Sequence, residues 1–184
     1  MIILYIVLAL AMLVCLVCAF WLIPSLIALI IARGVPFVPL GKKELNSINK
    51  FIKLTPTDRV VDLGSGDGRV LRLFERQGVD DLTGYEINLW PHIQAKIYNF
   101  FTKSKSKVYL RNFFNVDLAQ FNIVFCYLLE GCLTRLTKKF DSELKPGTKI
   151  VSYAFEIKNW HTPTEIIYTS EKKDRDRIFI YEIK

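Results

Sequence analysis

Short apolar runs alternate with amphipathic segments after residue 58, and this alternation constrains the fold more than any other feature of the chain. Strands are expected at 59–63, 82–86, 108–110, 123–127 and 149–154, and helices at 68–78, 89–101 and 133–144. Two further strands, 165–170 and 177–183, flank the charged EKKDRD turn as a hairpin. The pattern predicts an α/β fold with a mostly parallel, doubly wound, seven-stranded sheet and an antiparallel C-terminal hairpin at one edge.

The N-terminal segment is distinct in composition, because the first 32 residues carry no charged side chain. About 20 apolar residues are enough to cross the hydrocarbon core of a bilayer, so the segment predicts a transmembrane helix. As one straight helix it would reach about 48 Å, beyond the roughly 30 Å required. Pro24 therefore predicts a kink followed by a second apolar piece. A cleaved signal peptide would need a positive start and a small-residue cleavage site, and this segment has neither.

The charges that follow the apolar segment predict its orientation. Arg33, Lys42 and Lys43 come soon after it and nothing basic precedes it, so the remainder of the chain is expected on the cytoplasmic side. The net charge of +7 lies entirely on this part and is compatible with anionic lipid, an acidic partner or nucleic acid. Nucleic acid is disfavoured because no basic stripe with interleaved aromatic residues is present. Cys126 and Cys132 show no disulfide or metal-ligand spacing, so no metal is expected.

A glycine-rich loop, VDLGSGDGRV at 61–70, joins the first expected strand to the next helix. Three glycines within five positions are more than a tight turn requires, and they allow a ligand close to the backbone. The dinucleotide pattern G-x-G-x-x-G would need a glycine where Arg69 stands, and the Gly-Lys-Ser/Thr of a phosphate-binding P-loop is absent. The loop therefore indicates a ligand site of another kind at the carboxyl ends of the strands.

The segment DLGSGDG resembles the first motif of the class I S-adenosylmethionine (AdoMet) dependent methyltransferases. The resemblance implies a Rossmann-like fold in which the loop passes beneath the amino acid part of AdoMet. It implies that Asp62 helps to hold the ammonium group, Glu86 the ribose hydroxyls and Asn112 the adenine amine, while Phe113 packs on the adenine ring. The implied cofactor-binding set is Asp62, Gly64, Ser65, Gly66, Asp67, Gly68, Glu86, Asn112 and Phe113. The LKPG turn at 144–147, usual before the fifth strand of the class, agrees with this assignment.

A narrower resemblance covers nearly the whole chain. The segments PFVPLGKKELNSINKFIKL, GSGDGRV, GYEINLW, NVDLAQFNIVF and F-x-x-x-x-W are similar to the membrane-anchored ATP synthase c-subunit and adenine nucleotide translocase lysine methyltransferases. The resemblance implies protein-lysine methylation at a membrane. It also divides the chain into an anchor at 1–34, a pre-methyltransferase segment and helix at 35–58, and an AdoMet-binding domain at 59–184. The stretch CYLLE at 126–130 departs from the family pattern on the side expected to receive the methyl acceptor.

Aromatic residues near the ends of the last parallel strands are the expected catalytic set, because an apolar, aromatic channel favours the neutral amine that methyl transfer requires. These residues are Tyr127, Phe155 and Trp160. The stiff PFVP segment at 36–39 is either a lid over the cofactor or a linker from the membrane.

The sequence therefore predicts a single-pass membrane protein whose partners are lipid, through its N-terminal helix, and a protein lysine acceptor. Two other functions stay open: methylation of a small lipid-soluble acceptor or of RNA, and a membrane-tethered AdoMet sensor or scaffold without turnover.

Overall fold

The computed structural model describes residues 1–31, 37–169 and 177–184. Its helices are α1 (Ile2–Ile31), α2 (Lys42–Phe51), α3 (Arg69–Glu75), α4 (Leu89–Thr102) and α5 (Glu130–Glu143), with one 3₁₀ turn, η1 (Phe113–Asn115). Its strands are β1 (Arg59–Leu63), β2 (Asp81–Glu86), β3 (Lys107–Leu110), β4 (Ile123–Cys126), β5 (Lys149–Tyr153), β6 (Glu165–Tyr168) and β7 (Arg177–Glu182). Each expected element has a counterpart, while the EKKDRD turn and Pro36 lie outside the described residues.

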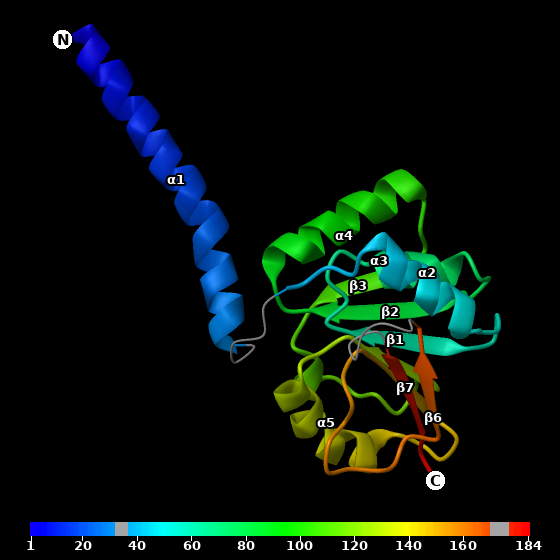
Figure 1. Cartoon of the computed structure of the whole chain (residues 1–184). Coiled ribbons are helices and arrows are strands. Elements are labelled where there is room, and N and C mark those ends of the chain that lie inside the picture. The colour runs from blue at the N-terminus through cyan, green and yellow to red at the C-terminus, as the bar shows by residue number, and fades with distance from the viewer. Residues whose placement is uncertain (32–36, 170–176) are drawn as a thin grey trace.

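The strands form a single seven-stranded sheet in the order β3-β2-β1-β4-β5-β7-β6 (Figure 1). Strands β1 to β5 are parallel, whereas β7 runs antiparallel to both β5 and β6. The predicted fold class is therefore confirmed. The strand order reverses between β1 and β4, and the carboxyl ends of the strands at such a reversal leave a crevice in which ligands bind.

Two apolar cores flank the sheet, one on each face. Helices α2, α3 and α4 cover one face, where Ile48, Phe74 and Ala95 are fully buried. Helix α5 covers the other face with Leu133, Leu136 and Phe140, spaced three and four residues apart so that they fall on one side of the helix. This packing leaves the carboxyl ends of β1, β2 and β4 clear for the loops that follow them.

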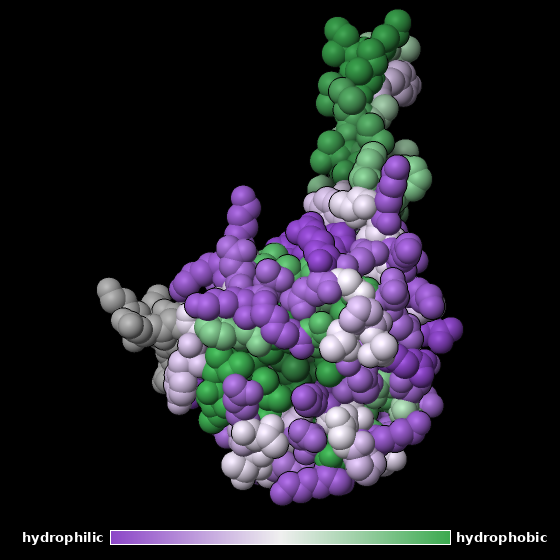
Figure 2. All heavy atoms as spheres, turned by 90° about the vertical axis from the view of Figure 1, so that its right-hand side faces the viewer, coloured by the Kyte–Doolittle hydropathy of each residue, from purple (hydrophilic) through white to green (hydrophobic). Residues whose placement is uncertain are grey.

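Helix α1 stands out from the domain as an apolar column, while many hydrophilic side chains cover the domain itself (Figure 2). It runs from Ile2 to Ile31 as one helix, so the apolar piece expected after Pro24 continues the same helix. The kink expected at Pro24 stays a prediction. The 22 residues Ile2–Ile23 are long and apolar enough to cross a bilayer, and none of this window is buried against the domain.

Candidate functional site

A cavity of about 570 Å³ lies at the carboxyl ends of β1, β2 and β4. Its walls come from the glycine loop, the end of β2, residues 112–114, the end of β4 and the segment 37–40. Helix α1 contributes Trp21, Leu22 and Leu26 to the same walls. The crevice of the sheet therefore bounds the cavity on one side, and the C-terminal part of α1 bounds it on the other.

The glycine loop uses most of its backbone amides within the protein. Gly64, Gly66 and Gly68 have φ angles of +82°, +55° and +76°, which glycine adopts at little cost. The N–H groups of Gly64 and Ser65 both donate to the Tyr85 carbonyl, at 2.9 and 3.1 Å. That of Gly66 donates to Glu86 Oε2 at 2.8 Å. The loop is therefore not a cradle of free amides for a phosphate.

Three buried carboxyl groups line the cavity: Asp62, Asp67 and Glu86, exposed by 3, 5 and 6%. Desolvation, followed by the charges of Glu86 and Asp67, raises the pKa of Asp62 to about 8. Burial likewise raises the pKa of Glu86, although amide donors at Asn88, Gly66 and Ile87 oppose that shift. Asp67 is paired with Arg69, so the uncompensated acids are Asp62 and Glu86. They suit a cationic ligand, because a nearby positive charge would favour ionised carboxylates.

Two further features of the loop fit AdoMet. The Ser65 hydroxyl is buried and has no hydrogen-bond partner among the residues that the structure describes, so a polar ligand group can complete it. A Cβ at Gly66 would lie 2.3 Å from Cε2 of the Phe37 ring, so only bare backbone fits beneath that ring. The buried acids, the Ser65 hydroxyl and the bare loop together suit a ligand that carries an ammonium group and a sulfonium centre.

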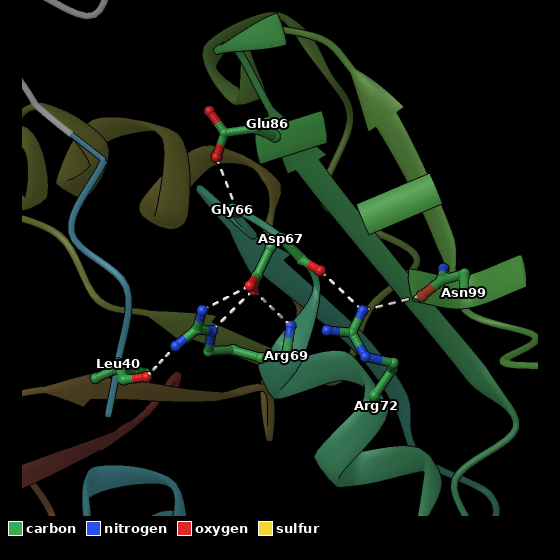
Figure 3. A network of polar contacts seen from close by, with 7 residues as sticks. All are labelled: Leu40, Gly66, Asp67, Arg69, Arg72, Glu86 and Asn99. Carbon is green, nitrogen blue, oxygen red and sulfur yellow. Dashed lines mark hydrogen bonds and ion pairs between the residues drawn. The ribbon is translucent and has the colours of Figure 1, made fainter. Parts of the chain in front are cut away.

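Arg69 ties the segment 37–40 to the glycine loop (Figure 3). Its guanidinium pairs with Asp67, with Nη2 to Oδ2 at 2.6 Å and Nε to Oδ1 at 2.9 Å, and it also donates to the Leu40 carbonyl oxygen. Arg72 links the loop to α4: its Nη1 donates to the Asp67 carbonyl at 2.8 Å and to Asn99 Oδ1 at 3.1 Å. Both carboxylate oxygens of Asp67 are thus engaged by Arg69, a residue that the motif alone did not assign to the site.

The cavity extends to the residues expected around adenine. Asn112 caps η1, and its Oδ1 accepts from the Phe114 N–H at 3.0 Å. Phe113 is buried and its ring lies 4.9 Å from that of Phe114. Because both side chains line the same cavity as Glu86, the structure brings the expected ribose and adenine residues together.

The expected catalytic aromatics do not all lie together. Tyr127 lines the cavity, and Phe155 stacks on it from behind with ring centroids 6.3 Å apart. Trp160 lies elsewhere: its ring packs on Phe140 and Tyr181, and its Nε1 donates to Asp141 Oδ1 at 2.9 Å. The structure thus places Tyr127 at the cavity wall and Trp160 on the α5 side of the sheet.

Gly68 also lies outside the cavity wall, although it belongs to the expected cofactor-binding set. It precedes α3, and a Cβ there would lie 3.0 Å from Arg72 Nη1 and 3.5 Å from Ala95 Cβ. Its left-handed backbone and this close approach let the helix start directly after the loop. Gly68 therefore allows the backbone turn between the loop and α3 and does not line the cavity.

Comparison with known proteins adds to this geometry. Residues 62–164 match the family model described as the ANTKMT methyltransferase domain. The chain is 32% identical over 152 residues to a protein-lysine N-methyltransferase of Saccharolobus islandicus (strain REY15A), covering 81% of this chain and 94% of that protein. This chain belongs to the same family. The resemblance drawn from its motifs is therefore confirmed.

Further similarities are to proteins from mouse and to a solved structure. The adenine nucleotide translocase and ATP synthase c-subunit lysine N-methyltransferases of Mus musculus are 26 and 27% identical over 81 and 73% of this chain. The chain spans only 63 and 56% of their own lengths. An RNA methyltransferase from Salinibacter ruber, solved with S-adenosyl-L-homocysteine, aligns with a TM-score of 0.70 and 25% identity, covering 79% of this chain and 94% of that one. The protein is an AdoMet-dependent methyltransferase.

The pKa of Asp62 predicts how AdoMet binding by this methyltransferase depends on pH. Below about pH 8 the Asp62 carboxyl is mostly protonated, whereas an ammonium group is held best by the ionised form, so binding releases a proton. We expect affinity to rise by up to about tenfold per pH unit between roughly pH 6 and 7 and to level off near pH 8. Calorimetric titration of wild type and Asp62→Asn measures this, and a flat wild-type profile would contradict it.

The position of Phe37 over Gly66 favours a lid, the first of the two alternatives left open for the PFVP segment. Phe37 lines the cavity and is 36% exposed, so a cofactor packed against the exposed side of its ring would gain part of the roughly 1.5–3 kcal/mol of a fully buried phenylalanine. We expect Phe37→Ala to weaken AdoMet binding about tenfold. Tyr168→Ala, on exposed strand β6, is the matched control. Equal affinity of Phe37→Ala and wild type would identify the segment as a linker.

Proposed function

We propose that the protein is a membrane-anchored protein-lysine N-methyltransferase that acts on a membrane or membrane-proximal protein. The observation that carries this proposal is the composition of the cavity wall. Trp21, Leu22 and Leu26 of α1 line the same cavity as Asp62 and Glu86. An acceptor held close to a membrane-crossing α1 would therefore meet the cofactor cavity without leaving the bilayer surface. The Saccharolobus and mouse relatives, all of them named as lysine N-methyltransferases, support the choice of acceptor.

The proposed anchoring follows from α1 and the charges after it. Ile2–Ile23 would cross the bilayer once, and Arg33, Lys42 and Lys43 favour the cytoplasmic side for the catalytic domain. In this arrangement residues 1–34 serve as anchor, 35–58 as the connecting segment with α2, and 59–184 as the methyltransferase domain. An anchor shared with its targets raises their effective concentration at the active site.

The proposed chemistry needs little acid or base catalysis from the protein. AdoMet supplies a methyl group activated by a sulfonium sulfur. The lone pair of the acceptor nitrogen would form the bond to the methyl carbon as the electron pair of the bond from that carbon leaves with sulfur. A protonated amine has no such lone pair, so it would first lose its proton to water. Residues of the chain position the two reactants in line and exclude solvent from them.

The aromatic part of the cavity wall suits the acceptor side. Tyr127 faces the cavity, and Tyr153 and Phe155 support it, with ring centroids 5.7 and 6.3 Å from its own. An apolar, aromatic environment lowers the pKa of a lysine from about 10.4, which favours the neutral amine. We propose Tyr127 as the residue beside the acceptor, Phe155 as its support, and Asp62, Glu86, Asn112 and Phe113 as the cofactor-holding residues. In this proposal Trp160 packs on Phe140 and Tyr181 and has no contact with the acceptor.

Labelled methyl transfer tests the proposal. The full chain, reconstituted in vesicles with a membrane protein fraction, is incubated with AdoMet that carries a radioactive methyl group. We expect label in protein, recovered as methyl-lysine after acid hydrolysis, and no label with Glu86→Ala. Label found only in the lipid extract, or only in RNA when RNA is added to a parallel reaction, would contradict the lysine acceptor. Absence of transfer to any fraction, with AdoMet still bound, would instead support the sensor alternative.

A further inference from the structure

Helix α4 carries apolar side chains on the face turned away from the sheet as well as on the face turned toward it. Pro91, Ala95 and Asn99 are buried on the inner face. On the outer face Ile97, Phe100 and Phe101 are 48, 79 and 76% exposed. A surface helix of a soluble domain normally presents polar residues at these positions. The outer face of α4 is therefore suited to contact with another apolar phase.

Helix α4 and the segment after it carry charges of one sign, while Glu75 of α3 lies beside them and accepts from the Lys105 N–H at 2.6 Å. Residues 87–116 include no Asp or Glu, while five basic residues lie there: Lys96, Lys103, Lys105, Lys107 and Arg111. All five are exposed. Aromatic and aliphatic residues on one face of a helix, flanked by lysines, are typical of helices that lie in the headgroup region of an anionic bilayer. The charges favour such a surface over an apolar protein partner.

The position of α4 relative to α1 agrees with this orientation. Trp90, at the start of α4, stacks on Trp21 with ring centroids 4.0 Å apart, and its Nε1 donates to the Trp21 carbonyl at 2.8 Å. Trp21 lies near the end of the apolar window Ile2–Ile23, where tryptophans meet the membrane–water interface. From this junction α4 runs across the direction of α1, along the side of the domain nearest the N-terminal half of α1 (Figure 1). The outer face of α4 would thus lie level with the bilayer surface.

We propose that the outer face of α4, formed by Ile97, Phe100 and Phe101, inserts into the headgroup boundary of the anionic membrane that α1 crosses. The proposal rests on the membrane anchoring proposed above. It adds a second membrane contact, so that the domain cannot rotate freely below its anchor. The cavity, whose wall includes Trp90 and Trp21, is then held open toward acceptors at the bilayer surface.

Spin labels on the full chain in vesicles containing anionic lipid test this contact. Phe101→Cys and the control Tyr168→Cys each replace an exposed aromatic residue. Both are made and spin-labelled in a chain whose exposed cysteines are removed by Cys15→Ala and Cys18→Ala. That chain without either new cysteine, treated with the same label, is the blank. We expect the ratio of oxygen to nickel-chelate accessibility to be several-fold higher at 101 than at 168. Equal ratios at 101 and 168 would overturn the proposal.

A third label separates this proposal from the anchor. Leu10→Cys lies in the middle of the apolar window. If the label at 10 reports the bilayer interior while that at 101 reports water, the α4 contact fails and the anchor stands. If both report water, the anchor fails and the α4 contact with it. Dipolar broadening at 101 with low access to both relaxing agents would indicate a second copy of the chain on this face and would also overturn the proposal. The methyl-transfer assay tests the proposed function separately, because its result does not depend on any of the three spin labels.

Discussion

Glu86→Ala is expected to weaken AdoMet binding at least about 100-fold while leaving the fold intact. Glu86 accepts from Gly66 N–H at 2.8 Å through Oε2 and from Asn88 N–H at 2.7 Å through Oε1. Its carboxylate therefore holds the glycine loop and the start of α4 in place while facing the cavity. Hydrogen bonds to a charged group contribute about 1.5–3 kcal/mol each, so losing two to the ribose would cost about 3 kcal/mol or more.

Without cofactor the same variant should lose some stability, because the Gly66 and Asn88 N–H groups lose their acceptor. Relief of the repulsion between Glu86 and its buried neighbour Asp62 offsets part of that loss. Calorimetric titration gives the affinity. A thermal scan at 100 times the wild-type dissociation constant, where wild type gains about 2.7 kcal/mol, gives an independent value. Glu165→Ala, an exposed acid at the start of β6, is the matched control. Wild-type affinity in Glu86→Ala would remove Glu86 from the cofactor site.

Gly84→Ala is expected to lower the free energy of unfolding by about 2–3 kcal/mol, as overpacking of a closed core does. Gly84 lies in β2, and a Cβ there would approach Ser65 Oγ to 2.5 Å, Ser65 Cβ to 2.6 Å and Leu71 Cδ1 to 2.7 Å. Both neighbours are buried, so neither can move without disturbing the glycine loop or α3. We therefore expect AdoMet binding to weaken as well, since Ser65 lines the cavity.

Gly131→Ala is a control that we expect to change the free energy of unfolding in the opposite direction. Gly131 lies in the first turn of α5, where a Cβ would have nothing within 4 Å. Alanine there should stabilise the protein by up to about 0.5–1 kcal/mol through helix propensity. Urea unfolding of the full chain in detergent micelles measures both variants. A Gly84→Ala variant as stable as wild type would contradict the close packing of β2 against the loop.

Much of the fold was predictable because its signals are local. The buried strand at 59–63, the glycines at 64, 66 and 68 and the acid that ends β2 each follow from residue type and spacing, and their order specifies the parallel sheet. Tyr127 was predictable for the same reason, since it directly follows a strand whose carboxyl end lies at the crevice. These features depend on one or two neighbouring elements only.

The positions of Trp160, Trp21 and the segment 37–40 depend on contacts between distant parts of the chain. After β5 the chain turns at Ala154, whose φ is +68°, and the Ile157 N–H donates to the Tyr181 hydroxyl at 2.8 Å. This turn carries Trp160 to the α5 side, which no local spacing shows. Trp21 reaches the cavity through its contact with Trp90, 69 residues away, and the segment 37–40 is held there by the bond from Arg69 to the Leu40 carbonyl, 29 residues away. Only the folded arrangement brings these pairs together.

A crystal structure of the full chain with S-adenosyl-L-homocysteine tests the proposed site most directly. We predict that the ligand lies in the cavity at the ends of β1, β2 and β4, with its ribose hydroxyls on Glu86, its amino group toward Asp62 and its adenine beside Phe113. We also predict that the sulfur faces the part of the wall formed by Tyr127. A ligand bound outside this cavity, or one whose sulfur faces away from Tyr127, would contradict the proposed site.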